Sequence, residues 1–284
     1  MKGVMIQGTA SNVGKSLLTT ALCRLFAEKG YAAAPFKAQN MSNRTIQTED
    51  GKEMSVAQAQ QAEAAGLTPS VRMNPIVLKP SEDHRTEVIF MGETISTING
   101  GDYQKVYFNE AKQTIQSALK QLEQQCDLIF LEGAGSPVEM NLKERDLANM
   151  AVAEMANVPV ILTADIDRGG AFASIAGTLA LLTEEERNRV KGLIINKFHG
   201  DVTSFASGNE WLEAYTGIPV LGVVPYIEHG LAEEDSVEGI STPEAHTSNF
   251  LLKNATYEKL AKHLEKHLDW RKLLKIILGE KHVH

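Results

Sequence analysis

The fold is decided near the N-terminus by the stretch Gly8-Thr9-Ala10-Ser11-Asn12-Val13-Gly14-Lys15-Ser16, which follows an apolar run and opens a segment with helical spacing. A glycine-containing loop between a strand and a helix lets backbone N–H groups and the helix N-terminus hold a phosphate. In such a loop Lys15 can reach the β- and γ-phosphates of a nucleotide, and the Ser16 hydroxyl is placed for Mg²⁺. Thr9 stands where the commonest spacing has its first glycine. The stretch predicts nucleotide binding.

Apolar runs alternate with helix-length segments along most of the chain. The runs of strand length are Val4–Gln7, Ala32–Phe36, Asp127–Leu131, Val158–Ala164, Gly192–Ile195 and Val220–Val224. The helical segments are Ser16–Lys29, Asn109–Gln125, Asp146–Asn157, Ala171–Leu182 and Glu210–Thr216. This alternation predicts an α/β fold with a mostly parallel sheet and helices on both faces. Residues 38–108 are more polar and less regular, and insertions of this kind often line a site.

The composition indicates a globular protein without a broad basic surface. The 284 residues carry 28 Lys and Arg against 36 Asp and Glu, a formal net charge of −8. This balance disfavours a nucleic-acid or anionic-membrane surface, although a local loop can still bind a small anion. No apolar run reaches the roughly 18 residues that a membrane helix requires. The N-terminus lacks a signal-peptide pattern, so we expect a cytoplasmic protein.

The charge differs between the body and the C-terminal end. Residues 253–284 hold eight Lys and Arg against four Asp and Glu, a net charge of +4 in an otherwise acidic chain. Such a shift indicates a segment with a different history. We expect a body at residues 1–238, a linker at 239–252 and a helical tail at 253–284.

Carboxylates at strand ends are the candidate metal ligands, because Mg²⁺ prefers hard oxygen donors. Glu132 follows the run Asp127–Leu131, and the carboxyl ends of parallel strands share a crevice with the phosphate loop. Its alternative role is that of a solvated loop acid. Asp50 is a weaker candidate, since an Asp50-Gly51 turn explains it equally well.

Three further polar groups follow predicted strands. Lys37 could stabilise negative charge on a transferring phosphoryl group, or could simply be solvated. The stretch Asp165-Ile166-Asp167-Arg168-Gly169-Gly170 places charges in a turn that faces the same crevice. The amide of Asn196 could contact a base edge. A helix cap or turn explains the last two equally well.

These motifs occur in one order with several others along the chain. The others are Ala34-Pro35-Phe36-Lys37-Ala38-Gln39-Asn40-Met41-Ser42, Met73-Asn74-Pro75, Leu78-Lys79-Pro80, Glu132-Gly133-Ala134-Gly135-Ser136-Pro137, Ile195-Asn196-Lys197-Phe198 and Gly217-Ile218-Pro219-Val220-Leu221-Gly222. The ordered set resembles the synthetase domain of the cobyric acid synthase family of cobalamin biosynthesis, over residues 1–238. The loop is also similar to those of dethiobiotin synthetase and of cobyrinic acid a,c-diamide synthases. The resemblance implies a P-loop NTPase fold.

The resemblance implies an ATP-dependent amide ligase with ATP and Mg²⁺ as cofactors. Such enzymes phosphorylate peripheral carboxylates of the corrinoid adenosylcobyrinic acid a,c-diamide, and ammonia drawn from glutamine then displaces the phosphate. Carried over to this chain, the family's residues assign the nucleotide to Gly8, Thr9, Ser11, Asn12, Val13, Gly14, Lys15, Ser16 and Asn196. They assign Mg²⁺ to Ser16, Asp50 and Glu132, catalysis to Lys15 and Lys37, and the corrinoid to Gln39, Asn40, Asp165 and Arg168.

The sequence departs from the family pattern at its cysteines. The family's glutamine-hydrolysing domain uses a cysteine nucleophile on a strand-to-helix elbow. Cys23 lies inside the phosphate-loop helix and Cys126 precedes a strand without such an elbow, so both are expected to be packing residues. We therefore expect the glutaminase domain to be missing. The stretch Thr256–Ala261 resembles the family's closing helix, although an unrelated amphipathic helix fits it too.

Three functions remain open from the sequence. The first is a synthetase that uses free ammonia or ammonia from a separate glutaminase subunit. The second is a degenerate remnant that binds nucleotide or corrinoid without amidation. The third is a related ligase of the dethiobiotin synthetase or cobyrinic acid a,c-diamide synthase type. A partition- or septum-type ATPase is disfavoured, because the loop opens Gly8-Thr9-Ala10 without the additional lysine usual there. A homo-oligomer is left open.

Overall fold

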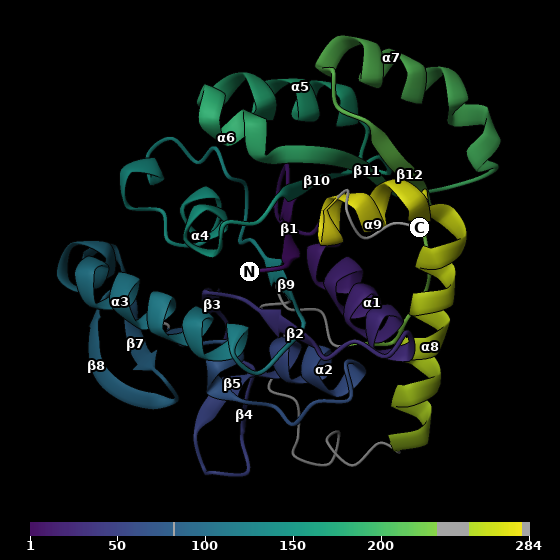
Figure 1. Ribbon diagram of the computed structural model, residues 1–284. Coiled ribbons are helices and arrows are strands. Elements are labelled where there is room, and N and C mark those ends of the chain that lie inside the picture. The colour runs from purple at the N-terminus through teal and green to yellow at the C-terminus, as the bar shows by residue number, and fades with distance from the viewer. Residues whose placement is uncertain (82, 232–249, 280–284) are drawn as a thin grey trace.

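The six apolar runs form one parallel sheet in a computed structural model (Figure 1), which describes residues 1–81, 83–231 and 250–279. The strand order is β12-β11-β10-β1-β9-β2, and every neighbouring pair is parallel. The strands are β1 (Gly3–Gly8), β2 (Ala33–Phe36), β9 (Leu128–Glu132), β10 (Val160–Asp165), β11 (Val190–Phe198) and β12 (Val220–Pro225). The predicted α/β fold is confirmed.

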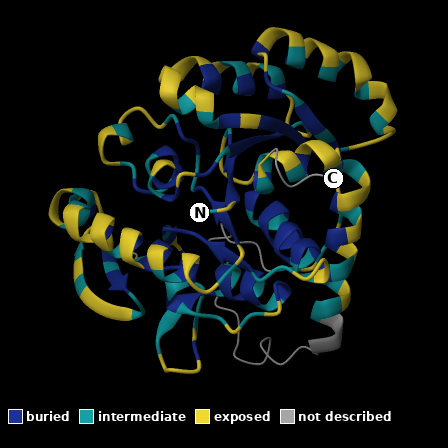
Figure 2. Ribbon diagram, in the orientation of Figure 1, coloured by how far each residue is buried: buried dark blue, intermediate teal, exposed yellow. Residues whose placement is uncertain are grey.

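Helices cover both faces of this sheet, because successive strand residues point to opposite sides. In β1, Val4 and Ile6 belong to the apolar cluster on one face, whereas Met5 belongs to the cluster on the other. The first face packs against α1 (Lys15–Glu28). The second packs against α3 (Tyr103–Glu123), α4 (Met150–Ala156), α5 (Ala171–Leu181) and α7 (Ala206–Thr216), and α6 (Glu184–Arg189) precedes β11. Figure 2 shows the sheet as the buried layer between them.

Residues 38–108 form a second sheet that the sequence did not predict. Its order is β3-β6-β7-β8, with β3 (Gln39–Met41), β6 (Ile76–Pro80), β7 (Arg85–Phe90) and β8 (Glu93–Asn99). A separate hairpin, β4 (Thr45–Gln47) and β5 (Glu53–Ser55), leads into α2 (Val56–Ala64). The chain passes from the large sheet to the small one at Lys37, whose N–H donates to the Met73 carbonyl at 2.9 Å. The region therefore lies beside the carboxyl end of β2.

The C-terminal segment forms two helices, α8 (Phe250–His267) and α9 (Trp270–Leu278), as predicted. In Figure 1 α8 lies along α1, and Leu260 and Leu264 share one apolar cluster with Leu22 and Phe26 of α1. The helices therefore complete the cover of one sheet face. Most of the expected linker, 239–249, lies outside the described residues, so the boundary between body and tail stays a prediction. None of the described helices is long and apolar enough to cross a membrane.

The end of α8 approaches β12 closely because residue 222 is a glycine. Gly222 pairs with Leu268 in an isolated antiparallel bridge, and a Cβ at Gly222 would lie 2.1 Å from the His267 carbonyl oxygen. The Asp269 N–H next to this bridge donates to the Leu221 carbonyl at 2.7 Å. The bridge fixes the turn between α8 and α9 to the edge strand of the sheet.

We predict that Gly222→Ala destabilises the fold by about 1–3 kcal/mol, because the added methyl group must displace backbone atoms. Urea unfolding measures the change. Gly177→Ala is the matched control: Gly177 lies in α5 with nothing within 4 Å of a Cβ, so we expect a gain of about 0.5–1 kcal/mol. Equal stability of the wild-type and Gly222→Ala chains would contradict the close approach.

Candidate functional site

A cavity of about 920 Å³ lies at the carboxyl ends of the parallel strands. Its lining comes from the phosphate loop, from β3 of the small sheet, from the loop that follows β9 and from the segment that follows β12. The crevice outside the carboxyl ends of the strands is where open α/β sheets bind their ligands. The cavity is therefore the candidate site.

The phosphate loop presents the start of α1 to this cavity. Gly14 has φ 96°, in the left-handed region that glycine adopts most easily, and α1 begins at the next residue. The Lys15 ammonium donates to the carbonyls of Ala10 at 3.0 Å and Gly135 at 3.2 Å, so it lies across the loop. The N–H groups of the first turn and the positive dipole end of α1 make this position suitable for phosphate.

The end of β11 supports the loop from behind. The Asn196 amide donates to the Val13 carbonyl at 2.8 Å, and the Lys197 ammonium donates to the Asn12 carbonyl at 2.5 Å. A Cβ at Gly14 would lie 2.1 Å from the Asn196 amide nitrogen, so the glycine is needed for this contact. One N–H of Asn196 is therefore committed to the loop, which leaves its second N–H and its oxygen for a ligand.

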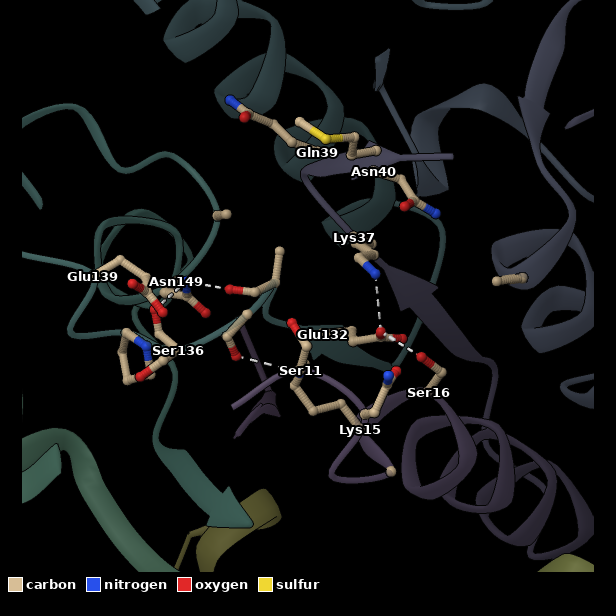
Figure 3. Close-up of a pocket in the computed structure, with 18 of the residues that line it drawn as sticks. Ser11, Lys15, Ser16, Lys37, Gln39, Asn40, Glu132, Ser136, Glu139 and Asn149 are labelled. Carbon is tan, nitrogen blue, oxygen red and sulfur yellow. Dashed lines mark hydrogen bonds and ion pairs between the residues drawn. The ribbon is translucent and has the colours of Figure 1, made fainter. Parts of the chain in front are cut away.

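Glu132, the last residue of β9, joins three elements around one buried carboxylate (Figure 3). Its Oε1 accepts from the Ser16 hydroxyl at 2.7 Å and from the Lys37 ammonium at 3.1 Å. Its Oε2 accepts from the Gln61 amide of α2 at 2.7 Å. The Glu132 side chain is 0% exposed and that of Lys37 is 6% exposed, so the pair is removed from water. The structure thus brings together Ser16, Lys37 and Glu132.

Two further supporting residues were missed from the sequence. Gln61 holds Glu132, but it lies in a polar stretch where a buried amide has no distinguishing pattern. Asn149 donates to the Ala134 carbonyl at 2.7 Å, and a Cβ at Gly133 would lie 2.3 Å from its amide oxygen. Asn149 therefore shapes the Gly133–Ser136 loop on the cavity wall. Its position after Ala148 gave no signal, because the partner is a backbone carbonyl.

Asp50 does not join the candidate metal ligands in this structure. It lies exposed in the turn between β4 and β5, and it is absent from the described lining of the cavity. The hydroxyl of Thr48 donates to its carboxylate, and this hydrogen bond lowers the pKa of Asp50. The local turn accounts for the residue, as the Asp-Gly dipeptide suggested.

Three of the four residues assigned to the substrate line the cavity. Gln39 and Arg168 line the cavity. Asn40 also lines it, but its buried amide already donates to Ser55 at 2.7 Å and to Gln58 at 2.8 Å. Asp165 is not part of the described lining and pairs with Lys197 at 3.1 Å. The Asn40 amide is therefore occupied by hydrogen bonds inside the protein, and Asp165 contacts the cavity lining through Lys197.

Neither cysteine lies at the cavity. Cys23 is fully buried in α1, and burial raises the pKa of its thiol far above the usual range. Burial also raises the pKa of Cys126. A thiol with a raised pKa holds little of the thiolate that a nucleophile needs. The expectation that both cysteines are packing residues agrees with this environment.

A phosphate loop at the switch from strand to helix, with a buried carboxylate opposite, defines a nucleotide-binding α/β protein. The family model described as "CobQ/CobB/MinD/ParA nucleotide binding domain" matches residues 4–236, and the chain belongs to that family.

Named relatives agree with the resemblance found in the motifs. The chain is 55% identical over 236 residues to a protein named cobyric acid synthase from Citrobacter koseri, covering 83% of this chain and 46% of the relative. It is 54% identical over 236 residues to a protein of the same name from Salmonella gallinarum, covering 83% and 47%. The chain thus spans about half the length of the curated relatives it matches.

We predict strong coupling between Lys37 and Glu132. Removing one partner of a buried pair costs about 3–5 kcal/mol, so Lys37→Met and Glu132→Gln should each be strongly destabilising. The double variant should cost less than the sum by about 1–3 kcal/mol, because no charge of the pair is left unmatched. Urea unfolding of the four chains measures this coupling.

The exposed pair Lys105–Asp102, at 3.6 Å, is the matched control for this cycle. Both side chains are largely in water, so their coupling should stay below about 0.5 kcal/mol. Additive costs at Lys37 and Glu132 would contradict the buried contact.

Proposed function

We propose that this chain binds Mg·ATP and uses it to amidate peripheral carboxylates of adenosylcobyrinic acid a,c-diamide, a step of cobalamin biosynthesis. The observation that carries the proposal is the hydrogen-bonded group of Ser16 with the buried Lys37 and Glu132 beside the phosphate loop. The identity with proteins named cobyric acid synthase supports the substrate. The nucleotide and the acceptor carboxylate would meet at Lys37, where the two sheets adjoin.

The donor set fits Mg²⁺. Ser16 offers a hydroxyl and Glu132 a carboxylate, 2.7 Å apart, and both are the hard oxygens that Mg²⁺ takes alongside phosphate oxygens and water. When bound, the ion supplies positive charge against the β- and γ-phosphates. Lys15 and the loop N–H groups from Gly8 to Ser16 would hold the same phosphates, and the remaining donor and acceptor of Asn196 would meet adenine.

The proposed reaction has two steps. A substrate carboxylate oxygen attacks the γ-phosphorus, the bond to the β-phosphate oxygen breaks, and ADP leaves with an acyl phosphate formed. Ammonia then attacks the acyl carbon, the carbon–oxygen bond to phosphate breaks, and the proton lost by nitrogen leaves with phosphate. Lys37 would offset the negative charge of carboxylate and phosphoryl group as they approach, which is the main demand of phosphoryl transfer.

The cavity suits an amphipathic substrate. Its lining combines the polar loop with Leu78, Met41 and Leu142, and Met41 is 63% exposed. A corrinoid has an apolar ring and a polar rim of amides and carboxylates. The apolar side chains would contact the ring, and Gln39 and Arg168 would contact the rim. Arginine pairs with carboxylates in two parallel hydrogen bonds, which favours this role for Arg168.

We predict ATP- and Mg²⁺-dependent amidation with ammonium, and none with glutamine alone, because neither cysteine is placed to hydrolyse it. Mass spectrometry of the corrinoid and phosphate release measure the product. Ammonia from a separate glutaminase subunit would replace free ammonium. Lys15→Ala should lower the rate on the order of 10²–10³-fold, the effect of removing one charge-stabilising donor.

Lys112→Ala, on the exposed side of α3, is the control and should leave the rate unchanged. Nucleotide binding without an amidated product would contradict the ligase and favour a protein that only binds. Equal activity with glutamine and with ammonium would contradict the conclusion that neither cysteine hydrolyses glutamine.

A further inference from the structure

Two side chains of the C-terminal helix α8 contact backbone carbonyls at the end of β12 and in the segment that follows it, which lines the cavity. His263 lies 2.9 Å from the Pro225 carbonyl through Nε2, and the Lys259 ammonium donates to the Glu228 carbonyl at 2.9 Å. Pro225 ends β12, and Tyr226, Ile227 and Leu231 in the following segment line the cavity. We call residues 225–231 the β12 wall. Two of its carbonyls are thus bound by one helix.

The β12 wall begins beside the end of β11, whose Asn196 and Lys197 hold the phosphate loop. β11 and β12 are neighbours in the sheet, with Phe198 opposite Pro225, so the wall begins two residues beyond the level of Asn196. The Tyr226 N–H donates to the Phe198 carbonyl at 2.9 Å. The Tyr226 ring is 51% exposed and stacks on His199 with centroids 5.1 Å apart. An aromatic ring, two aliphatic side chains and an amide are a lining that suits a planar heteroaromatic base.

The wall depends on α8 for its position. Residues 226–231 have no helix or strand of their own, so their backbone groups need partners from elsewhere. α8 is a firm support, because Tyr257 is 1% exposed, its hydroxyl donates to Glu63 of α2 at 3.1 Å, and Leu260 and Leu264 are buried against α1. The helix is fixed on the core side and binds the wall on the other.

The chemistry of His263 suits a donor. The Pro225 carbonyl can only accept, so Nε2 must carry the proton. Burial lowers the pKa of His263, and the hydrogen bond to Pro225 raises it. The neighbouring His267, Lys259 and Lys266 lower it further, and the net shift is downward. His267 in turn donates from Nδ1 to the His263 carbonyl at 2.8 Å. A neutral ring with its N–H on Nε2 meets the geometry.

We propose that His263, with Lys259, is a positioning residue that holds the β12 wall as one side of the nucleobase subsite. The C-terminal helix then contributes to the affinity for the base and not to the affinity for the phosphates. The inference rests on the nucleotide binding proposed above. It gives the segment after residue 250 a role in ligand binding in addition to its packing on α1.

The test separates base from phosphates by comparing two ligands. Isothermal titration calorimetry with Mg²⁺ measures the affinities for ATP and for inorganic tripolyphosphate, which has no base. The wild-type chain should bind ATP more tightly. His263→Ala should weaken ATP by about 3- to 10-fold, the effect of one hydrogen bond, and leave tripolyphosphate unchanged. His263→Gln retains an N–H donor and should recover much of the loss.

Two further variants keep the result readable if His263→Ala reduces stability. Tyr226→Ala removes the ring of the wall without touching α8 and should show the same difference between the ligands. Lys262→Ala is the matched control, because its side chain is 73% exposed and makes only a 3.9 Å pair with Glu258. It should change neither affinity.

The outcomes distinguish the two proposals. If His263→Ala weakens both ligands equally, or leaves ATP binding unchanged, the role of α8 at the base is wrong and the phosphate site still stands. The same holds if the wild-type chain binds ATP no more tightly than tripolyphosphate. If the wild-type chain binds neither ligand, the proposed function fails and this inference fails with it.

Discussion

The rest of the site depends on one buried carboxylate, that of Glu132. A carboxylate without water is stable only when its lone pairs are met by well-placed donors. Here the donors are a hydroxyl from the start of α1, an ammonium from the end of β2 and an amide from α2. Each lies on a different element, so satisfying the charge fixes the relative position of all three. The requirement to pair one charge orders the phosphate loop, the junction of the sheets and α2 together.

The second constraint is the burial of α1 between the sheet and the C-terminal helices. One side of α1 packs on β1 and β9, and Leu260 and Leu264 of α8 cover the other side. A helix with only one covered face would leave Leu22 or Phe26 in water. The basic tail therefore belongs to the core, and its charges lie on the surface around that contact, as in the pair Lys29–Glu265 at 2.7 Å. The change in net charge along the sequence therefore coincides with helices that pack on α1.

The sequence predicted those site residues whose positions follow from their neighbours along the chain. Glu132 and Lys37 directly follow apolar runs, and parallel strands bring their carboxyl ends to one edge, so the pairing could be expected from chain order. Gln61 could not, because it lies in the polar helix α2, where nothing in the sequence distinguishes a buried glutamine from an exposed one. Asp50 shows the converse. The Asp50-Gly51 dipeptide predicted its local turn, whereas the resemblance assigned Asp50 to a metal site. In this structure the β4–β5 hairpin holds Asp50 outside the described lining of the cavity.

Helix α2 links the two halves of the cavity. Gln61 holds Glu132 on the nucleotide side, and Gln58, one turn earlier, accepts from Asn40 at 2.8 Å on the side where Gln39 lines the cavity. Both glutamines are almost fully buried, at 0–1% exposure, so neither can exchange its partner for water without opening the core. A shift of α2 would move both contacts at once. The metal-ligand candidate Glu132 and the part of the cavity proposed for the substrate therefore keep a fixed relative position, which a two-substrate reaction at Lys37 requires.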